Sequence, residues 1–268
     1  MARLDAEVPF GERLKTWRHT RRLSQLQLAL VARVSPRHLS FIETGRAQPS
    51  REMVHLLAEH LRLPLRERNA LLLAAGFAPA FERRDLGAPE MSAVRAAVSM
   101  ILKNHEPFPA IAVDRRWNVV MSNSAVPLIA EGVAPELLAP PVNVYRLSLH
   151  RDGLRRRVLN FDEYARHLLG RIRHDVEVSG DVELLDLLGE VEAYPGLGAF
   201  AEVAPQRGNV VLPIRLRHET GELAFFTTIT TFGTPCDVTV EELAIESFFP
   251  ADHSTAERVR ALGASCKF

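Results

Sequence analysis

The stretch SPRHLSFIETGRAQPS, residues 35–50, decides the fold of the first part of this chain. A helix over 36–44 turns Leu39, Ile42 and Glu43 to one side. Its other side carries one guanidinium, two hydroxyls and an aromatic ring, with an imidazole on the flank: Arg37, Ser40, Thr44, Phe41 and His38. A solvated face usually carries Glu, Lys and Gln. This set instead suits a flat, polar surface with acceptor edges and methyl groups, and a base-pair edge is one candidate.

Residues that start and stop helices divide the first 78 positions into five helices, at about 9–22, 25–32, 36–44, 51–61 and 65–75. Ser24 and Gln27 form a capping box, and Ser35 and Ser50 are the N-caps of the next two helices. Gly45 ends the helix 36–44. A capped helix, a short turn at 33–34 and a second capped helix have the helix-turn-helix spacing.

The apolar positions of these helices are expected to form one core. In the second helix we expect Leu28, Ala29 and Val31 inside, with Leu26 partly covered. In the fourth helix the buried face is the apolar stripe at residues 54, 57, 58 and 61.

The full string LSQLQLALVARVSPRHLSFIETGRAQPSREMVHLLAEHL, residues 23–61, is more specific than the spacing. It resembles the Cro-repressor-like, or Xre-type, helix-turn-helix family. The pattern is carried by Leu23-Ser24-Gln25, Leu28-Ala29, Val34-Ser35, Glu43-Thr44-Gly45 and Pro49-Ser50. The resemblance covers about 9–75 and implies an all-α, five-helix DNA-binding domain over 1–78. The family often has Gly where this chain has Arg33, so either the turn differs here or Arg33 is strained.

This resemblance implies that 36–44 is a recognition helix lying in the major groove. Arg37 can then reach guanine O6 and N7, and Phe41 can rest against a thymine methyl group or pack on the next helix. Ser40 and His38 add local hydrogen bonds. The remaining predicted DNA contacts are Gln25, Ser35, Thr44 and Arg46, of which Gln25, Thr44 and Arg46 are expected on phosphates. Arg18 and Glu43 match positions that pair in the family, and we interpret them as a structural ion pair.

The charge distribution supports a polyanion-binding first part. The chain has 268 residues and no net charge, but up to Ala78 there are 13 Lys and Arg against 7 Asp and Glu. The remainder carries 20 basic against 26 acidic residues. A basic head joined to an acidic body is typical of a separate nucleic-acid-binding module, although clustering of Arg by chance is the alternative.

The stretch GFAPAFERRDLGAPEM contains several Pro and Gly residues, and we interpret 79–91 as a linker. Beyond it, the sequence predicts a helix at 94–106, strands at 110–113 and 119–121, and helices at 125–131, 161–173 and 182–191. Asn160 and Glu163 have capping-box spacing before the helix 161–173. A hairpin over about 210–232, a strand at 243–249 and a helix at 254–263 follow. This order favours an α+β domain over 92–268, an antiparallel sheet with helices on one face.

Four strings carry a second resemblance: NHEPFPAIAVDRRWNVVMSN, NVYRLSLHRDGL, VLNFDEYARHLL and ELAFFTTITTFGTPCDVTVEELAIESFFPAD. They resemble the MmyB-like ligand-binding domain, a PAS-like module found behind this type of helix-turn-helix in bacterial regulators. The resemblance covers about 92–262. It implies a sensor of a small ligand.

A sheet with Phe, Ile and Thr on its faces can leave an apolar cavity with a few hydroxyl groups. We expect a small apolar or amphipathic ligand, with a fatty-acid-like molecule as one class. The candidate lining residues are Phe108, Trp117, Asn123, Phe226, Thr228 and Thr230. For each of them, ordinary core packing is the alternative.

The sequence offers no convincing catalytic arrangement, so we do not predict an enzyme, a cofactor or a metal site. It has no nucleophile elbow, zinc-binding H-E-x-x-H or phosphate-binding loop. Two alternatives stay open for the second domain: an enzyme, or a body that only dimerises. A homodimer is expected on double-stranded DNA because one short helix reads few base pairs.

Two further features concern location. Cys236 and Cys266 lack motif spacing, and we expect reduced, unpaired thiols in a cytoplasmic protein, with a disulfide as the alternative. No run approaches the roughly 18 apolar residues of a membrane span, and the N-terminus has no apolar segment of a signal peptide.

Overall fold

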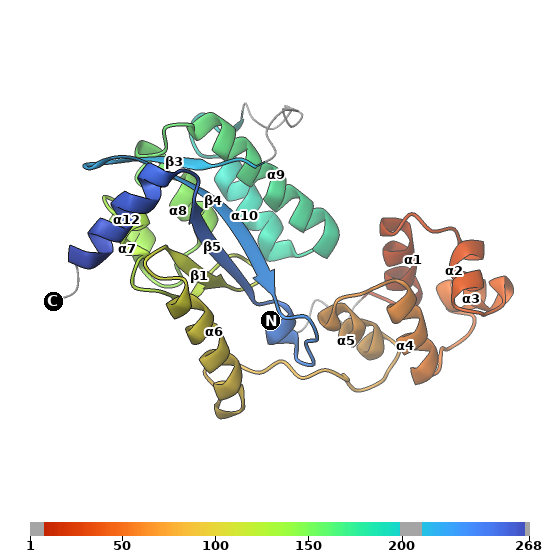
Figure 1. Cartoon of the computed structure of the whole chain (residues 1–268). Helices are drawn as coiled ribbons and strands as arrows, with labels where there is room; N and C mark the ends of the chain where they lie inside the picture. Colours follow the sequence, from red (N-terminus) through yellow and green to blue (C-terminus); the bar gives the residue numbers. More distant parts are fainter. Residues whose placement is uncertain (1–7, 199–210, 266–268) are drawn as a thin grey trace. The chain divides into compact units, whose positions relative to one another are not determined.

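The computed structural model describes residues 8–198 and 211–265. Its backbone contacts divide the chain into two compact units (Figure 1). The first unit is Met1–Asp85 together with Gly233–Glu241, and the second is Leu86–Phe232 together with Glu242–Phe268. The sequence did not predict that Gly233–Glu241 would belong with the first unit.

The first unit contains the five expected helices: α1 (Phe10–Thr20), α2 (Gln25–Val31), α3 (Pro36–Glu43), α4 (Arg51–His60) and α5 (Leu65–Ala74). Ser24 and Gln27 form the predicted capping box, and the Ser35 and Ser50 hydroxyls each accept from an amide of the following helix. Leu14, Leu28, Leu39, Ile42 and Leu57 meet in one core. The local helix signals of the sequence are therefore confirmed.

Two details of α2 differ from the prediction. Val31 is 49% exposed and Leu26 is 56% exposed, while Ala32 takes the interior position that was expected for Val31. The helix ends at Val31, and Ala32 is its C-cap residue directly before the turn. Arg33 has a φ of 53°, so the turn is the left-handed one and a non-glycine residue holds it.

The segment Gly233–Glu241 is joined to the first unit by several hydrogen bonds. Its short helix α11 (Val238–Glu241) contacts α5. The Val238 N–H donates to the Glu82 carbonyl at 2.9 Å, and Arg84 pairs with the buried Asp237 carboxylate at 3.1 Å. Cys236 in this segment is exposed, and Cys266 lies outside the described residues.

The second unit is built on a five-stranded antiparallel sheet in the order β2-β1-β5-β4-β3. Its strands are β1 (Ala110–Val113), β2 (Val119–Ser122), β3 (Ile214–His218), β4 (Gly221–Thr231) and β5 (Ala244–Pro250). Its helices are α6 (Ser92–Asn104), α7 (Pro127–Ala130), α8 (Val144–Leu149), α9 (Phe161–Ser179), α10 (Val182–Glu192) and α12 (His253–Ser265). Short 3-10 turns lie at Pro89–Met91, Pro135–Leu138 and Leu154–Arg156. The α+β fold with an antiparallel sheet is confirmed.

Helices cover both faces of this sheet, which corrects the expectation of one covered face. Along β1, Ile111 and Val113 join the large core that includes α9 and α10. Ala110 and Ala112 point the other way and pack with residues of α6. Because β1 is buried on both sides, it reads as the continuous apolar run AIAV, without alternation of polar and apolar residues. Figure 1 shows α6 on one side of the sheet and the α9–α10 pair on the other.

The capping box predicted at Asn160 and Glu163 is wrong. Asn160 precedes α9 without a side-chain cap. Its amide instead donates to the Pro213 carbonyl at 2.8 Å and accepts from the Arg215 N–H at 3.0 Å. The side chain therefore ties the start of α9 to β3, a long-range use that sequence spacing does not reveal.

Candidate DNA interface and ligand pocket

The outer face of α3 is held in place by a buried ion pair beneath it. The Arg18 Nε donates to Glu43 Oε1 at 2.7 Å and its Nη2 donates to Oε2 at 2.9 Å, with both side chains at most 7% exposed. Gln25 Nε2 donates to the same carboxylate at 2.7 Å. Arg18 from α1 and Gln25 from α2 therefore both bind Glu43 of α3, and these bonds hold the three helices together.

The protonation of Glu43 follows from these contacts. Burial by itself would raise the pKa of the carboxyl group, but the hydrogen bonds from Arg18 and Gln25 and the charge of Arg18 outweigh it, and the pKa lies below its ordinary value of 4.5. The carboxylate is charged at neutral pH. The ion pair interpreted from the sequence is present.

On the exposed side of α3, the guanidinium groups of two arginines lie close to the ring of Phe41. Arg37 Cζ lies 5.3 Å from the centre of the Phe41 ring, and Arg46 Cζ lies 6.0 Å from it. Arg33, Arg37 and Arg46 are all exposed. Phe41 is half-buried and lies within cation–π range of both arginines, so its ring can stabilise both guanidinium groups at the outer surface.

The structure brings the other predicted DNA contacts to the same region, with some of their hydrogen-bonding groups in use. Thr44 Oγ1 donates to the Ser40 carbonyl at 2.8 Å, so its single proton is committed to the helix. Ser35 Oγ accepts from the His38 N–H at 3.1 Å and keeps its own proton for a partner. Gln25 gives one amide proton to Glu43, and the second has no acceptor among the residues that the structure describes.

A second candidate site is a cavity of about 170 Å³ inside the second unit. Its wall is mostly apolar and comes from the sheet, α7, α8 and α9. The apolar lining includes Ile111, Val119, Ile129, Val144, Leu154, Ile214 and Phe248. The polar groups on the wall are Ser122, Ser148, Tyr164 and Glu246.

Glu246 is the unusual member of this wall. It projects from β5, in register with Ile111 of β1 and Ile229 of β4, and its side chain is 6% exposed. Arg171 Nη1 lies 3.6 Å from its Oε1, while Oε2 accepts no hydrogen bond from the described residues. The sequence reading missed Glu246. The available signal was one acidic residue inside the apolar strand AIESFF.

Arg171 is held by aromatic side chains. Its Cζ lies 3.7 Å from the centre of the Trp117 ring, and its Nε donates to the Tyr145 hydroxyl at 3.2 Å. Trp117 has a φ of 63° at the end of the β1–β2 turn, and its Nε1 donates to Asp175 at 3.2 Å. The turn conformation, rare for a tryptophan, therefore places the ring beneath the guanidinium.

The remaining polar pair at the cavity is Tyr164 with Ser148. Burial raises the pKa of the Tyr164 hydroxyl to about 12, the nearby Glu246 charge adds to this rise, and a hydrogen bond with Ser148 opposes it. The hydroxyl is therefore protonated at neutral pH.

The six predicted ligand residues do not line this cavity. Asn123 is buried, but its amide donates to the Phe108 carbonyl at 2.8 Å and its carbonyl accepts from the Ala110 N–H at 3.1 Å. Trp117 supports Arg171, and Phe226 stacks on Phe249 at 5.5 Å. Thr228 and Thr230 are exposed, because they lie on the part of β4 beyond its pairing with β3.

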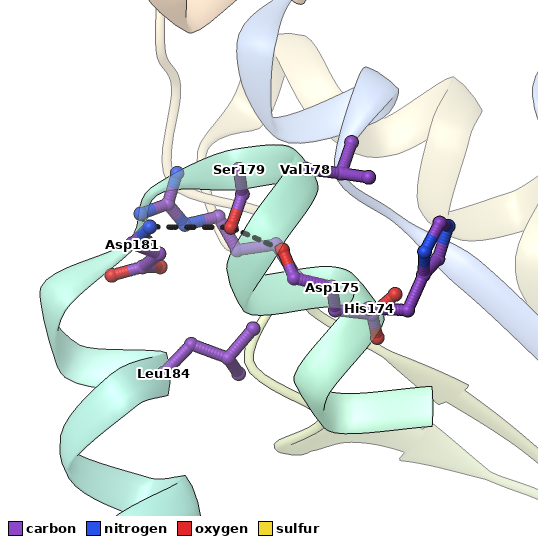
Figure 2. A pocket seen from close by; sticks show the side chains of 7 residues that line it. His174, Asp175, Val178, Ser179, Asp181 and Leu184 are labelled. Carbon is purple, nitrogen blue, oxygen red and sulfur yellow. Dashed lines mark hydrogen bonds and ion pairs between the residues drawn. The ribbon is translucent and has the colours of Figure 1, made fainter. Parts of the chain in front are cut away.

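A more polar hollow of about 260 Å³ lies where α9 ends and α10 begins, as Figure 2 shows. Its acidic groups already have partners. The Asp181 carboxylate accepts from the Glu183 N–H at 3.0 Å and pairs with Arg115 and Arg116. Ser179 Oγ donates to the Asp175 carbonyl at 2.6 Å. With these polar groups paired, the hollow has less to offer a ligand than the apolar cavity.

These features define the class of protein: a helix-turn-helix unit joined to an α+β unit with an internal apolar cavity. Residues 94–262, more than half of the chain, match the model of the MmyB-like transcription regulator ligand binding domain. Residues 9–71 match a helix-turn-helix domain model. The chain belongs to the family of MmyB-like transcription regulators, with a DNA-binding domain followed by a ligand-binding domain.

Other comparisons add little. A search of curated proteins finds no match. A solved structure titled "Structure of an RNA-binding Light-Oxygen-Voltage Receptor" is similar at 14% identity and a TM-score of 0.23, over 96% of this chain and 64% of that one. This chain thus spans less than two thirds of that protein's length. Among the described residues, no helix is both long and apolar enough to cross a membrane, and no cluster of three or more His, Cys, Asp or Glu could hold a metal ion.

Proposed function

We propose that this protein is a sequence-specific transcription regulator that binds double-stranded DNA as a homodimer in the cytoplasm of a bacterium. The observation that carries this proposal is α3: its outer face presents Arg37 and Phe41, with Arg46 just beyond the helix near the same ring, while a buried ion pair fixes its inner face. Two copies would present two such helices about one helical turn, ~34 Å, apart on a pseudo-palindromic site.

Within this function, each predicted DNA contact has a role that its hydrogen-bonding groups allow. Arg37 reads a guanine through O6 and N7, and Phe41 contacts a thymine methyl group. Ser40 and His38 contribute hydrogen bonds beside them. Arg46, the second amide proton of Gln25 and the hydroxyl proton of Ser35 bind phosphate oxygens. Thr44 reaches a phosphate only if its hydroxyl leaves the Ser40 carbonyl.

We propose that the second unit senses a small apolar or amphipathic molecule in the cavity walled by Tyr164, Glu246 and apolar residues. An engineered cavity of about 150 Å³ holds benzene, so about 170 Å³ suits a single ring or a short acyl-like chain. A fatty-acid-like ligand of this kind fits the apolar wall. Because Glu246 is buried without a full set of partners, the cavity favours a sensor over a body that only dimerises.

The ligand would act by binding one arrangement of the protein more tightly than another. The chain offers a direct route for this effect. β5 provides Glu246 and Phe248 to the cavity, and the residues just before it, Gly233–Glu241, belong to the first unit. A ligand that shifts β5 would therefore also displace the preceding segment, whose helix α11 contacts α5.

The test begins with selection of preferred duplexes from a random DNA pool by the purified full chain. We expect one pseudo-palindromic sequence, bound by a dimer, with an affinity that falls steeply as salt rises because phosphate contacts release counterions. Native mass spectrometry of freshly purified protein would report the dimer and any retained small molecule together. A flat salt response, or failure to bind any duplex at low salt, would contradict the proposal.

The alternative that the second unit is an enzyme predicts a different experimental result. Both matched families are regulatory domains, which favours a regulator. Recovery of a chemically altered small molecule after incubation with the protein, reproducible with catalytic amounts, would support an enzyme instead.

A further inference from the structure

We propose that the open edge of β4, residues 227–231, pairs with the same edge of a second copy of this chain, so that two sheets join into one across a two-fold axis. This inference rests on the homodimer of the proposed function. It goes further because it names the surface that forms the dimer and the register in which the two strands meet.

The sheet of the second unit has its outermost strands at β2 and β3, and neighbouring segments cover part of both. Along β3, the segment 157–159 exchanges backbone hydrogen bonds with Arg215 and Arg217. Beside β2, the Val119 N–H donates to the Val142 carbonyl at 2.8 Å. Native sheets commonly cover their edges in this way, because unpaired strand edges attract other strands.

β4 has an edge of its own because it is longer than its neighbour β3. Its pairing with β3 ends at Phe225, whereas its pairing with β5 continues in regular register to Thr231. Beyond Phe225, the open side of β4 has no backbone partner among the described residues. The stretch 227–231 also contains no Pro and no charged residue, so the usual features that keep strand edges apart are missing from it.

The direction of the backbone groups determines which residues can pair. The Ala251 N–H, next to β5, donates to the Ala224 carbonyl at 2.8 Å, so the even-numbered residues of β4 turn their backbone groups towards β5. Thr227, Ile229 and Thr231 therefore turn their N–H and C=O groups to the open side. With Ile229 on the axis, an antiparallel second copy pairs Ile229 with its own counterpart and Thr227 with Thr231, through about six hydrogen bonds.

The exposed side chains of this stretch suit a strand that pairs with itself. Ile229 is 48% exposed, and Thr228 and Thr230 are exposed on the opposite face of the sheet. In the proposed register the two Ile229 side chains cover each other on one face, and Thr228 lies opposite Thr230 on the other, a favourable cross-strand pair. Because the stretch is uncharged, two identical copies approach without like-charge repulsion, and the occupant that fits is a second copy.

The size of the contact sets the expected strength of the dimer. Residues 227–231 extend over roughly 17 Å. A standard protein interface buries about 800 Å² on each partner, and a strand pair of this length lies at the low end of the range. We therefore expect a dissociation constant on the order of 10 μM for the free chain. The dimer should tighten on DNA, because two linked heads bind neighbouring half-sites.

Sedimentation velocity of the purified full chain without DNA, from about 1 to about 200 μM, measures this constant. Ile229→Lys places two lysines opposite each other on the axis and should raise the dissociation constant by more than about tenfold. Val120→Lys is the matched control, because Val120 is a 40% exposed β-branched residue of the outer strand β2 and receives the same charge. It should leave the constant within about twofold.

Amide hydrogen exchange of the wild-type chain, resolved by residue with NMR, tests the register without any substitution. The N–H groups of Thr227, Ile229 and Thr231 should exchange more slowly as protein concentration rises, because pairing protects them. Those of Thr228 and Thr230 should not depend on concentration, since they face β5 in the monomer and the dimer alike. This measurement also decides the question if circular dichroism shows that Ile229→Lys does not fold.

The outcomes separate this inference from the proposed function. A wild-type dimer that Ile229→Lys leaves intact, or one without concentration-dependent protection at 227, 229 and 231, overturns the inference and leaves the dimeric regulator standing. Loss of the dimer in Val120→Lys also overturns it, because the contact would then involve β2. A chain that stays monomeric in solution but binds its selected duplex as a dimer overturns the inference alone. A chain that is monomeric both free and on DNA removes the homodimer of the proposed function as well.

Discussion

The carboxylate of Glu241 accepts a hydrogen bond at 2.7 Å from the backbone N–H of Leu65, a residue 176 positions earlier in the chain. Leu65 is the first residue of α5, and Pro64 before it provides no side-chain cap. The first N–H groups of a helix need acceptors, and a negative charge there also interacts favourably with the helix dipole. Glu241 therefore caps α5 from a segment that is continuous with β5.

Glu241→Ala should destabilise the first unit by about 0.5–2 kcal/mol, the usual cost of removing an N-cap. It should also weaken the effect of a cavity ligand on DNA affinity, since the segment before β5 would be held less firmly. Thermal unfolding and DNA titrations with and without ligand measure the two effects. Glu257→Ala, which removes an exposed carboxylate from α12, is the control. Unchanged stability in Glu241→Ala would show that the cap contributes nothing.

Arg37→Ala should cost about 1–3 kcal/mol of binding to the selected duplex and should flatten the preference at one base pair. The reason is the loss of a bidentate contact to a guanine edge. Fluorescence anisotropy with the selected site and with each single-base variant measures it. Lys15→Ala removes one exposed positive charge from α1 of the same unit and should leave the base preference intact. An equal loss on every sequence would place Arg37 on a phosphate.

The ion pair beneath α3 predicts a dependence of stability on pH. Because the pKa of Glu43 in the folded state is below its ordinary value of 4.5, the unfolded chain takes up the proton first as pH falls. The stabilisation is fully present above the ordinary carboxyl pKa and is lost as pH falls through the lowered folded value. Denaturant unfolding between neutral and acidic pH should show a weaker pH dependence in Glu43→Gln than in the wild type; equal slopes would contradict the assignment.

The same pair predicts a large cost for removing one partner. Arg18→Met should destabilise the first unit by about 3–5 kcal/mol, because it leaves the Glu43 carboxylate buried without its main donor. Removing both partners should cost less than the sum of the single changes. Denaturant unfolding of Arg18→Met, Glu43→Gln and the double variant forms the cycle, and additive losses would mean that the two side chains act independently.

The sequence predicted the features that depend on neighbours along the chain. Ser24, Ser35 and Ser50 begin α2, α3 and α4 through hydrogen bonds within three residues, so these three helices could be placed without any tertiary information. The alternation of side-chain types along 210–232 and the turn residues between its two halves likewise predicted the hairpin of β3 and β4. The helix-turn-helix resemblance, which covers about 9–75, added the pairing of Arg18 with Glu43, which helix spacing alone does not give.

The parts that could not be predicted depend on contacts between distant residues. Asn160 has the spacing of a cap but bonds to β3, and Glu241 caps a helix far earlier in the chain. The residues that line the cavity were not predicted for a related reason. The sequence drew attention to conspicuous Phe and Thr side chains of β4, whereas the cavity is lined by Glu246 of β5. Whether Thr228 faces a cavity or solvent depends on how far β3 extends beside β4, which local pattern does not determine.

Filling the cavity should abolish ligand binding without removing DNA binding. Ala130 of α7 lines the cavity, so Ala130→Phe places a ring in a space of about 170 Å³ that suits a ligand of similar size. Ala139→Phe makes the same side-chain change at an exposed position outside the cavity wall and serves as the control. Titration of phenol or 1-hexanol should show binding lost by more than about tenfold in Ala130→Phe and retained in Ala139→Phe. DNA affinity without ligand should stay within about twofold in a folded Ala130→Phe chain, because the predicted DNA-contact residues belong to the other unit. Retained probe binding in Ala130→Phe would mean that the ligand enters elsewhere in the second unit.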